Sequence, residues 1–267
     1  MKKAIALMLS IFLIYTFTGC ARTHTETSVP TTLRTQTTAP PTTQPPATEP
    51  PATEPVETVP EHSDLYIPDV SVEDVITWFS EVNFGREYGT EGDPTVIQKW
   101  ETPISYSLLG EATPEDWAVV EELAAWLNTV EGFPGIYPAE ESRYASLQVY
   151  FTNAQDMQTI MGPEYTNLDG AVTYWYEDDV IYDCHICVLY DLDPELRRSV
   201  LLEEIYNGLG PIQDTLLRPD SIAYQEFAKP QNLTVEDQLI LRLLYDPRIT
   251  CGMNAEECEA VIRSVYY

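Results

Sequence analysis

The sequence predicts an α+β domain over residues 63–267, preceded by a polar, proline-rich segment. Helical and strand periodicities both occur between Ser71 and Val265. Three strand-like segments precede the long helical segments, without strict β-α-β alternation. This length of chain suits one domain with a sizeable core, and we therefore expect a single domain.

The first residues have the pattern of an export signal. Lys2 and Lys3 form a basic start, and the apolar run over residues 4–17 is too short and too early to span a membrane. The run ends in Phe-Thr-Gly-Cys20, which resembles a bacterial lipobox. We predict a lipoprotein signal peptide over residues 1–19 and a lipid anchor on Cys20 at the extracytoplasmic face of the cell membrane. The alternative is an ordinary signal peptide in which Cys20 is incidental.

The segment from residue 20 to residue 62 consists almost entirely of Thr, Pro, Ala, Glu and Gln after its first cysteine. Pro-Ala-Thr-Glu-Pro occurs twice in succession, at 46–50 and 51–55. Such a composition has nothing to bury and favours an extended, polyproline-like state. We predict a disordered stalk between the lipidated cysteine and the domain.

The chain is strongly acidic, with 43 acidic and 14 basic residues and a net charge of −29. A surface of this charge repels nucleic acid and anionic lipid, so we expect no nucleic-acid partner. It attracts cations or basic partners, or it does no more than keep the protein soluble.

Besides Cys20, the chain has four cysteines: Cys184, Cys187, Cys251 and Cys258. In an exported domain they suggest two disulfides, with three possible pairings. Cys251–Cys258 is the preferred local pair. It leaves Cys184 with Cys187, although a spacing of three along a strand is awkward for a disulfide, and cross-pairing stays open. A metal knuckle around Cys184-His185-Ile186-Cys187 lacks a second C-x-x-C.

Start and stop signals place five helices. They are expected over Ser71–Asn83, from Thr113-Pro114 to the stop at Gly132–Gly135, over Leu196–Leu209, over Thr234–Tyr245 and over Ala255–Val265.

Strand signals occur in four segments. The segment over 96–109 is a strand pair or one strand bent at Pro103, and further strands are expected over 146–152, 171–176 and 180–189. Tyr174 and Tyr176 share one side of their strand. They form either part of the core, which we favour, or an exposed surface that stacks on sugar or peptide.

Residues 202–210 have the outline of a zinc-peptidase helix without its histidines. A zincin helix carries H-E-x-x-H and then Leu-Gly, so that two imidazoles one turn apart bind zinc and the glutamate activates water. Aligning Leu209-Gly210 puts Glu203 and Asn207 at the histidine positions and Glu204 at the general-base position. A histidine zinc site is excluded by counting, since the chain has three histidines and none lies in this helix: His24, His62 and His185.

Oxygen-bearing side chains gather around this helix. Glu203 and Asn207 are four residues apart and share a helical face with Glu204 beside them, and a turn after the helix can bring Gln213 or Asp214 to that face. Their oxygens suit Ca²⁺ or Mg²⁺ better than Zn²⁺, but we expect no cofactor.

Three interpretations of the acidic residues stay open. They are structural and pair with backbone or with Arg197, Arg198 or Arg242; they hold a metal; or Glu204 and Glu203 act as metal-free acid and base. His185 is a further candidate if its side chain faces the same site.

The order of these motifs resembles an uncharacterised bacterial secreted family, domain of unknown function 2927, with the central pattern E-E-x-x-Q-x-L-G-L-x-N-D. The resemblance runs from about Val70 to Val265. The matching segments are Phe84–Gly89, Lys99–Pro103, Phe133–Ile136, Leu201–Gly210, Asp214, Ser221-Ile222, Leu241–Ile249 and Gly252-Met253. Asn207 replaces the family's Gln, Pro211-Ile212-Gln213 replaces Leu-x-Asn, and the cysteines are additional.

The layout is also similar to that of zincin metallopeptidases, in which an L-[ST]-x-x-D helix ending in Leu-Tyr follows a turn beneath the metal. This resemblance implies a zincin-like single domain with a mixed sheet packed against helices. Our first hypothesis is therefore a surface-anchored, non-catalytic binding or scaffold module whose partner is an unknown protein, peptide or cell-wall glycan. The alternative is a hydrolase of peptide or cell-wall material that uses Glu204 and Glu203, and a third hypothesis is an aromatic carbohydrate-binding surface.

Overall fold

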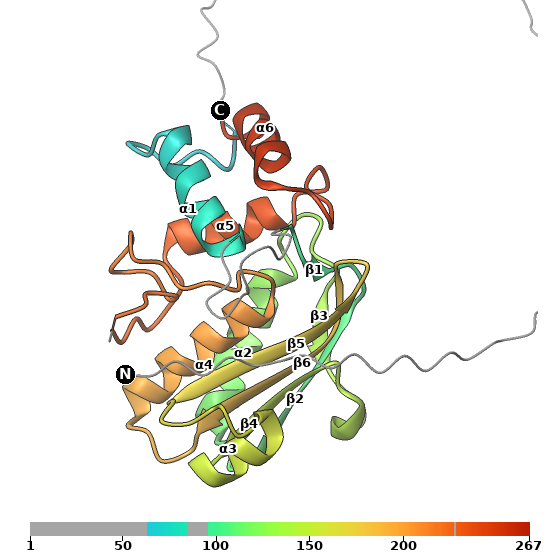
Figure 1. Ribbon diagram of the computed structural model, residues 1–267, viewed down its shortest axis with the longest axis vertical. Helices are drawn as coiled ribbons and strands as arrows, with labels where there is room; N and C mark the ends of the chain where they lie inside the picture. The colour runs from blue at the N-terminus through green and yellow to red at the C-terminus, as the bar shows by residue number, and fades with distance from the viewer. Residues whose placement is uncertain (1–62, 85–95, 227) are drawn as a thin grey trace, which may run out of the picture. The chain divides into compact units, whose positions relative to one another are not determined.

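Six strands form a mostly parallel sheet in the computed structural model, which describes residues 63–84, 96–226 and 228–267 (Figure 1). The strands are β1 (Lys99–Trp100), β2 (Ile104–Gly110), β3 (Ile136–Pro138), β4 (Leu147–Thr152), β5 (Gly170–Glu177) and β6 (Val180–Leu189). The helices are α1 (Val72–Phe84), α2 (Pro114–Leu127), α3 (Ala154–Met161), α4 (Pro194–Gly208), α5 (Val235–Leu244) and α6 (Ala255–Val265). The predicted signal peptide, Cys20 and the stalk lie outside the described residues.

The strand order is β1-β6-β4-β2-β3, and β5 pairs with β6. Every pairing is parallel except that of β5 with β6, so β5 is the one antiparallel strand among the described residues. The expected mixed sheet packed against helices in one domain is confirmed.

The sequence did not predict β3 and α3. Helix α2 connects β2 to the parallel strand β3, so this part of the chain does alternate strand, helix and strand. Helix α3 has only eight residues and begins at Asn153, whose side chain accepts hydrogen bonds from the backbone N–H groups of Gln155 and Asp156. The segment over 96–109 forms two strands on either side of Pro103, and each pairs with other strands.

Alternation along β4 shows which face of the sheet holds the main core. Leu147, Val149 and Phe151 are fully buried, whereas the residues between them are half-buried. Helix α4 packs against β5 and β6, and α2 packs against α4 and β3, so these two helices cover the core face (Figure 1). The short helix α3 covers part of the other face through Met157, which packs with Cys187.

The remaining helices form a separate group of contacts within the domain, because α1 packs against both α5 and α6. Helices α2, α5 and α6 each begin with a complete capping box, at Thr113, Thr234 and Asn254. In the part of the chain that the structure describes, no helix is long and apolar enough to cross a membrane.

Candidate functional site

Helix α4 carries the residues that the sequence singled out, and it lies against the sheet as predicted. Asp193 caps its first turn by accepting a hydrogen bond from the backbone N–H of Leu196 at 3.1 Å. At the other end of the helix, Gly208 faces β6, where an added Cβ would lie 2.9 Å from Sγ of Cys184. The helix therefore approaches the sheet closely because Gly208 has no side chain.

Glu204 points from α4 toward the beginning of β5. Only 9% of the residue is exposed, and a Cβ added at Gly170 would lie 2.6 Å from its Oε1 and 2.3 Å from Cγ1 of Val200. The carboxylate thus lies against the backbone of β5 at a position where only glycine leaves room. Gly170 therefore belongs to the site, although no local pattern in the sequence marks it.

The charge of Glu204 reaches the neighbouring strands. The pKa of the Cys187 thiol is raised to about 12, first by burial and then by the Glu204 carboxylate. The pKa of Tyr165 is also raised, chiefly by burial, with a smaller contribution from the same carboxylate. Because Glu204 is buried, water screens its charge only weakly from these neighbouring groups.

Asn207 occupies the second histidine position of the zincin outline and is 7% exposed. Among the described residues, its Oδ1 atom has no hydrogen-bond partner. Glu203, one turn earlier on the same face, is half-buried. This end of α4 therefore offers an uncommitted amide oxygen where a zinc peptidase has an imidazole.

The loop after α4 runs along the C-terminal end of α1. The backbone N–H groups of Ile212 and Gln213 donate to the carbonyl oxygen of Val82, at 3.0 and 3.2 Å. Oε1 of Gln213 and Oδ1 of the adjacent Asn83 are buried, and neither has a hydrogen-bond partner in the described parts of the chain. Asp214 follows in the same loop and is half-buried. The structure thus adds Asn83 to the candidate residues. In the sequence, Asn83 could have been noticed as a polar residue four positions after Phe79, on the apolar face of the predicted helix.

His185 lies on the other face of the sheet, so the structure does not bring it to Glu204. Its neighbours Cys184 and Ile186 point toward α4, and alternation along β6 sends His185 the opposite way. There its ring contacts those of Tyr150 and Trp175, with ring centroids 5.6 and 4.9 Å apart. His185 was a candidate only if its side chain faced the site of Glu204, and the structure does not meet this condition.

The alternative for Tyr174 and Tyr176, an exposed aromatic surface, does not fit the position of Tyr174. Tyr174 is 5% exposed, and its hydroxyl donates to Oε1 of Gln98 at 3.2 Å. Tyr176 is half-buried, with its ring centroid 6.3 Å from that of Tyr174. The interpretation of this pair as part of the core, which we favoured, fits these positions.

The three arginines that were considered as partners of the acidic residues have other partners. Arg197 contacts Asp116, Arg198 contacts Glu122, and Arg242 contacts Asp64. Within the described ranges, no group of three or more His, Cys, Asp or Glu side chains is placed to hold a metal ion.

The two predicted disulfides are not formed, since Cys184, Cys187, Cys251 and Cys258 are all free thiols. Cys184 belongs to the main core, and Cys187 packs with Met157 on the opposite face of β6. A spacing of three along a strand places two side chains on opposite faces, and a disulfide cannot connect them. Sγ of Cys251 lies 3.7 Å from the carbonyl oxygen of Lys99, and Cys258 is buried in α6.

These buried thiols lead us to expect that the domain loses stability as the pH rises above about 9. Burial raises the pKa of Cys184 well above 9.0, and it raises the pKa values of Cys187 and Cys258 to about 12. The unfolded chain then loses protons that the folded protein keeps, so the free energy of unfolding falls, by at most about 1.4 kcal/mol per pH unit and thiol. Burial lowers the pKa of Lys99, and this shift makes the free energy of unfolding rise with pH. The three thiols outnumber this single amine, so we expect a net loss of stability.

Urea unfolding at about pH 8 and about pH 10 measures this loss. Cys187→Ala is the informative variant, because it removes one titrating thiol, and its stability should fall less steeply with pH than that of the unmodified protein. An identical slope in both proteins would contradict the expected role of Cys187.

Comparison with known families identifies the chain. The family described as "Protein of unknown function (DUF2927)" matches residues 73–264, and the protein belongs to this family. The match begins in α1 and ends in α6, so it includes α4 and the loop that follows. None of the curated proteins compared with the chain matches it.

Proposed function

We propose that this protein is a lipid-anchored, cell-surface binding module that holds extended peptide segments without cleaving them. The observation that carries the proposal is the position of α4. The helix places Glu204 beside the first residue of β5, and it carries Glu203 and Asn207 at the two positions where a zinc peptidase has histidines. Asn207 keeps a buried oxygen without a partner among the described residues. On this proposal the fold is a zincin-like scaffold that has lost its zinc ligands.

Strand β5 supplies the means of binding. It pairs with β6 on one side, and no other described strand pairs with it. The unpaired backbone groups of such an edge are able to form main-chain hydrogen bonds with an extended peptide, which adds to the sheet as a further strand. A net charge of −29 favours basic peptides and disfavours nucleic acid.

The proposed location of the protein at the cell surface rests on its N-terminal residues. Lipid chains on Cys20 would hold the protein at the extracytoplasmic face of the membrane, and the Thr/Pro-rich segment would place the domain at a distance from it. Partners of the domain would then be proteins, peptides or glycans of the cell envelope.

The binding proposal is tested with the full mature chain carrying Cys20→Ser, so that it stays in solution, and with a library of basic peptides. The best binder is then remade twice, with N-methyl groups on one or the other alternate set of backbone amides. Only one set faces β5, so one methylated peptide should bind at least about 10-fold more weakly and the other should bind nearly as the parent does. Equal binding by both methylated peptides would exclude pairing along β5.

Hydrolysis of peptide or cell-wall material is the second candidate, and the burial of the Glu204 carboxylate favours it, because a buried carboxyl can serve as a general base. The same peptides and purified peptidoglycan are incubated with the protein and examined for cleavage products by mass spectrometry. The binding proposal expects no products from the unmodified protein. Products that disappear in Glu204→Gln, but persist in the exposed control Glu140→Gln, would establish catalysis instead.

A further inference from the structure

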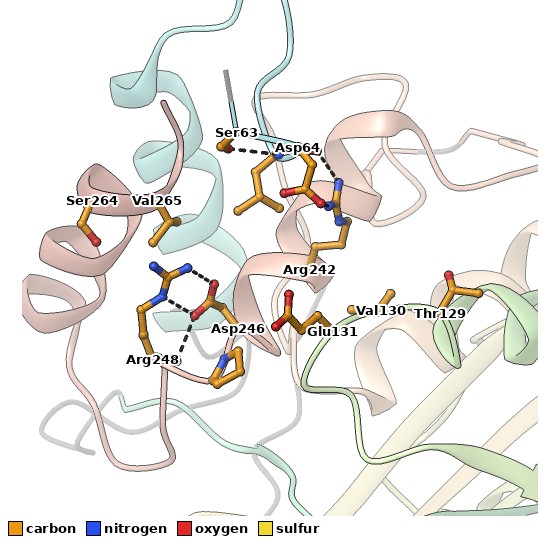
Figure 2. Close-up of a pocket in the computed structure, with 12 residues that line it drawn as sticks. Ser63, Asp64, Thr129, Val130, Glu131, Arg242, Asp246, Arg248, Ser264 and Val265 are labelled. Atoms are coloured by element: carbon orange, nitrogen blue, oxygen red, sulfur yellow. Dashed lines mark hydrogen bonds and ion pairs between the residues drawn. The ribbon is translucent and has the colours of Figure 1, made fainter. Parts of the chain in front are cut away.

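A polar cavity lies away from α4, where the described chain begins at Ser63. Its volume is about 490 Å³, which is in the range of small-ligand sites. Four parts of the chain form its walls (Figure 2): the segment Ser63–Leu65, the turn after α2, the end of α5 with the turn that follows, and the end of α6.

Two arginines line this cavity, and each is held by one carboxylate. Arg248 donates through Nε and Nη2 to the carboxylate of Asp246, at 2.8 and 2.7 Å. Arg242 donates through Nη1 to the carbonyl oxygen of Asp64 and through Nη2 to its carboxylate, at 2.8 and 2.5 Å. Nη1 of Arg248 and Nε of Arg242 have no hydrogen-bond acceptor in the parts of the chain described, so each guanidinium keeps an unused donor beside the cavity.

Glu131 is a charged residue of this cavity for which the described parts of the chain supply no ion pair. It is exposed in the turn after α2, and its carboxylate has no hydrogen-bond donor within the described residues. Figure 2 shows it between Asp246 and Val130. The pKa of Arg248 is raised chiefly by its hydrogen bonds to Asp246, and the negative charge of Glu131 raises it further. The lining therefore offers one carboxylate for a cation and spare guanidinium N–H groups for an anion.

From this arrangement we propose that the cavity binds a small zwitterion of the size of an amino acid or dipeptide. The ammonium group of the ligand pairs with Glu131, and its carboxylate accepts from the unused N–H group of one of the two arginines, Arg248 or Arg242. The site is distinct from the edge of β5 and does not depend on peptide binding there. Its charges favour a ligand with both ends ionised, because an anion alone would face three carboxylates.

Isothermal titration with L-alanyl-L-alanine, its N-acetyl derivative and its C-terminal amide tests the proposal on the full mature chain carrying Cys20→Ser. The free dipeptide should bind saturably, and each blocked form should bind at least about 10-fold more weakly, since each lacks one charged group. Failure of the free dipeptide to bind, or equal binding by the N-acetyl form, would overturn the assignment.

Glu131→Gln is the matching variant. Because Glu131 is exposed, the substitution should leave the fold intact, and it should weaken binding of the free dipeptide by about 10-fold. Glu140→Gln removes an exposed carboxylate that does not line the cavity, and it should bind as the unmodified protein does. Unchanged binding by Glu131→Gln would refute the role given to its carboxylate.

Discussion

Replacing Asp237 by alanine is expected to lower the free energy of unfolding by about 3–5 kcal/mol. Asp237 is fully buried, and its Oδ1 accepts from Nη1 of Arg218 at 2.7 Å and from Oγ of Ser221 at 2.6 Å. Oδ2 accepts from the backbone N–H groups of Ile222 and Thr234, both at 3.0 Å. Removing the carboxylate leaves the guanidinium of Arg218 buried without its counter-ion and removes the capping box of α5.

Urea unfolding measures the loss, and thermal unfolding should show a fall of about 10 °C. Asp220→Ala is the control, because this exposed carboxylate lies nearby and its removal should change the free energy of unfolding by about 0.5 kcal/mol or less. The double variant Arg218→Met with Asp237→Leu should recover part of the stability, since neither charge is then left buried alone. A loss below about 1 kcal/mol in Asp237→Ala would contradict the importance given to this pair.

Replacing Arg197 by methionine is expected to have an effect of similar size, about 3–5 kcal/mol, and it acts on the helix that carries the candidate site. The buried guanidinium donates from Nε and Nη2 to Asp116 at 2.9 and 2.5 Å, and it donates to the carbonyl oxygens of Tyr190 and Glu111. It also lies over the ring of Phe151, 4.4 Å from the centroid. Methionine preserves much of this packing but leaves the carboxylate of Asp116 buried without its cation.

The control for Arg197→Met is Arg198→Met on the same helix. Arg198 is partly exposed and contacts Glu122, so its loss should cost about 1 kcal/mol or less. Urea unfolding separates the two variants, and backbone hydrogen exchange shows whether α4 is the part that loosens. Equal destabilisation by both substitutions would show that burial of the Asp116 pair does not decide the effect.

Local signals predicted most helices well because their start and stop residues act within one turn. Thr113, Thr234 and Asn254 form capping boxes in the structure, and the sequence analysis had identified the first two as helix starts. The eight-residue helix α3 and the three-residue strand β3 have too few residues for a clear period, so they were missed.

The candidate site was predicted in part. The helix with Glu203, Glu204 and Asn207 lies against the sheet as expected. Which of its side chains share a face could be predicted, because residue spacing along a helix determines this by itself. The neighbours of that face could not be derived, since Gly170 reaches Glu204 through long-range packing. The same holds for the approach of the loop after α4 to the end of α1. The side on which His185 lies could not be derived, because the sequence does not reveal which face of β6 receives α4.

The sequence by itself determined the acidic character of the chain, the positions of the main helices, and the exclusion of a histidine zinc site, because composition and local spacing need no partner. The tertiary structure decided the rest. It placed Cys184 and Cys187 on opposite faces of one strand, left an edge of β5 beside Glu204, and brought Glu131 into one cavity with Arg242 and Arg248. These relations join residues far apart in the chain, and only the packing of the sheet and helices sets their distances.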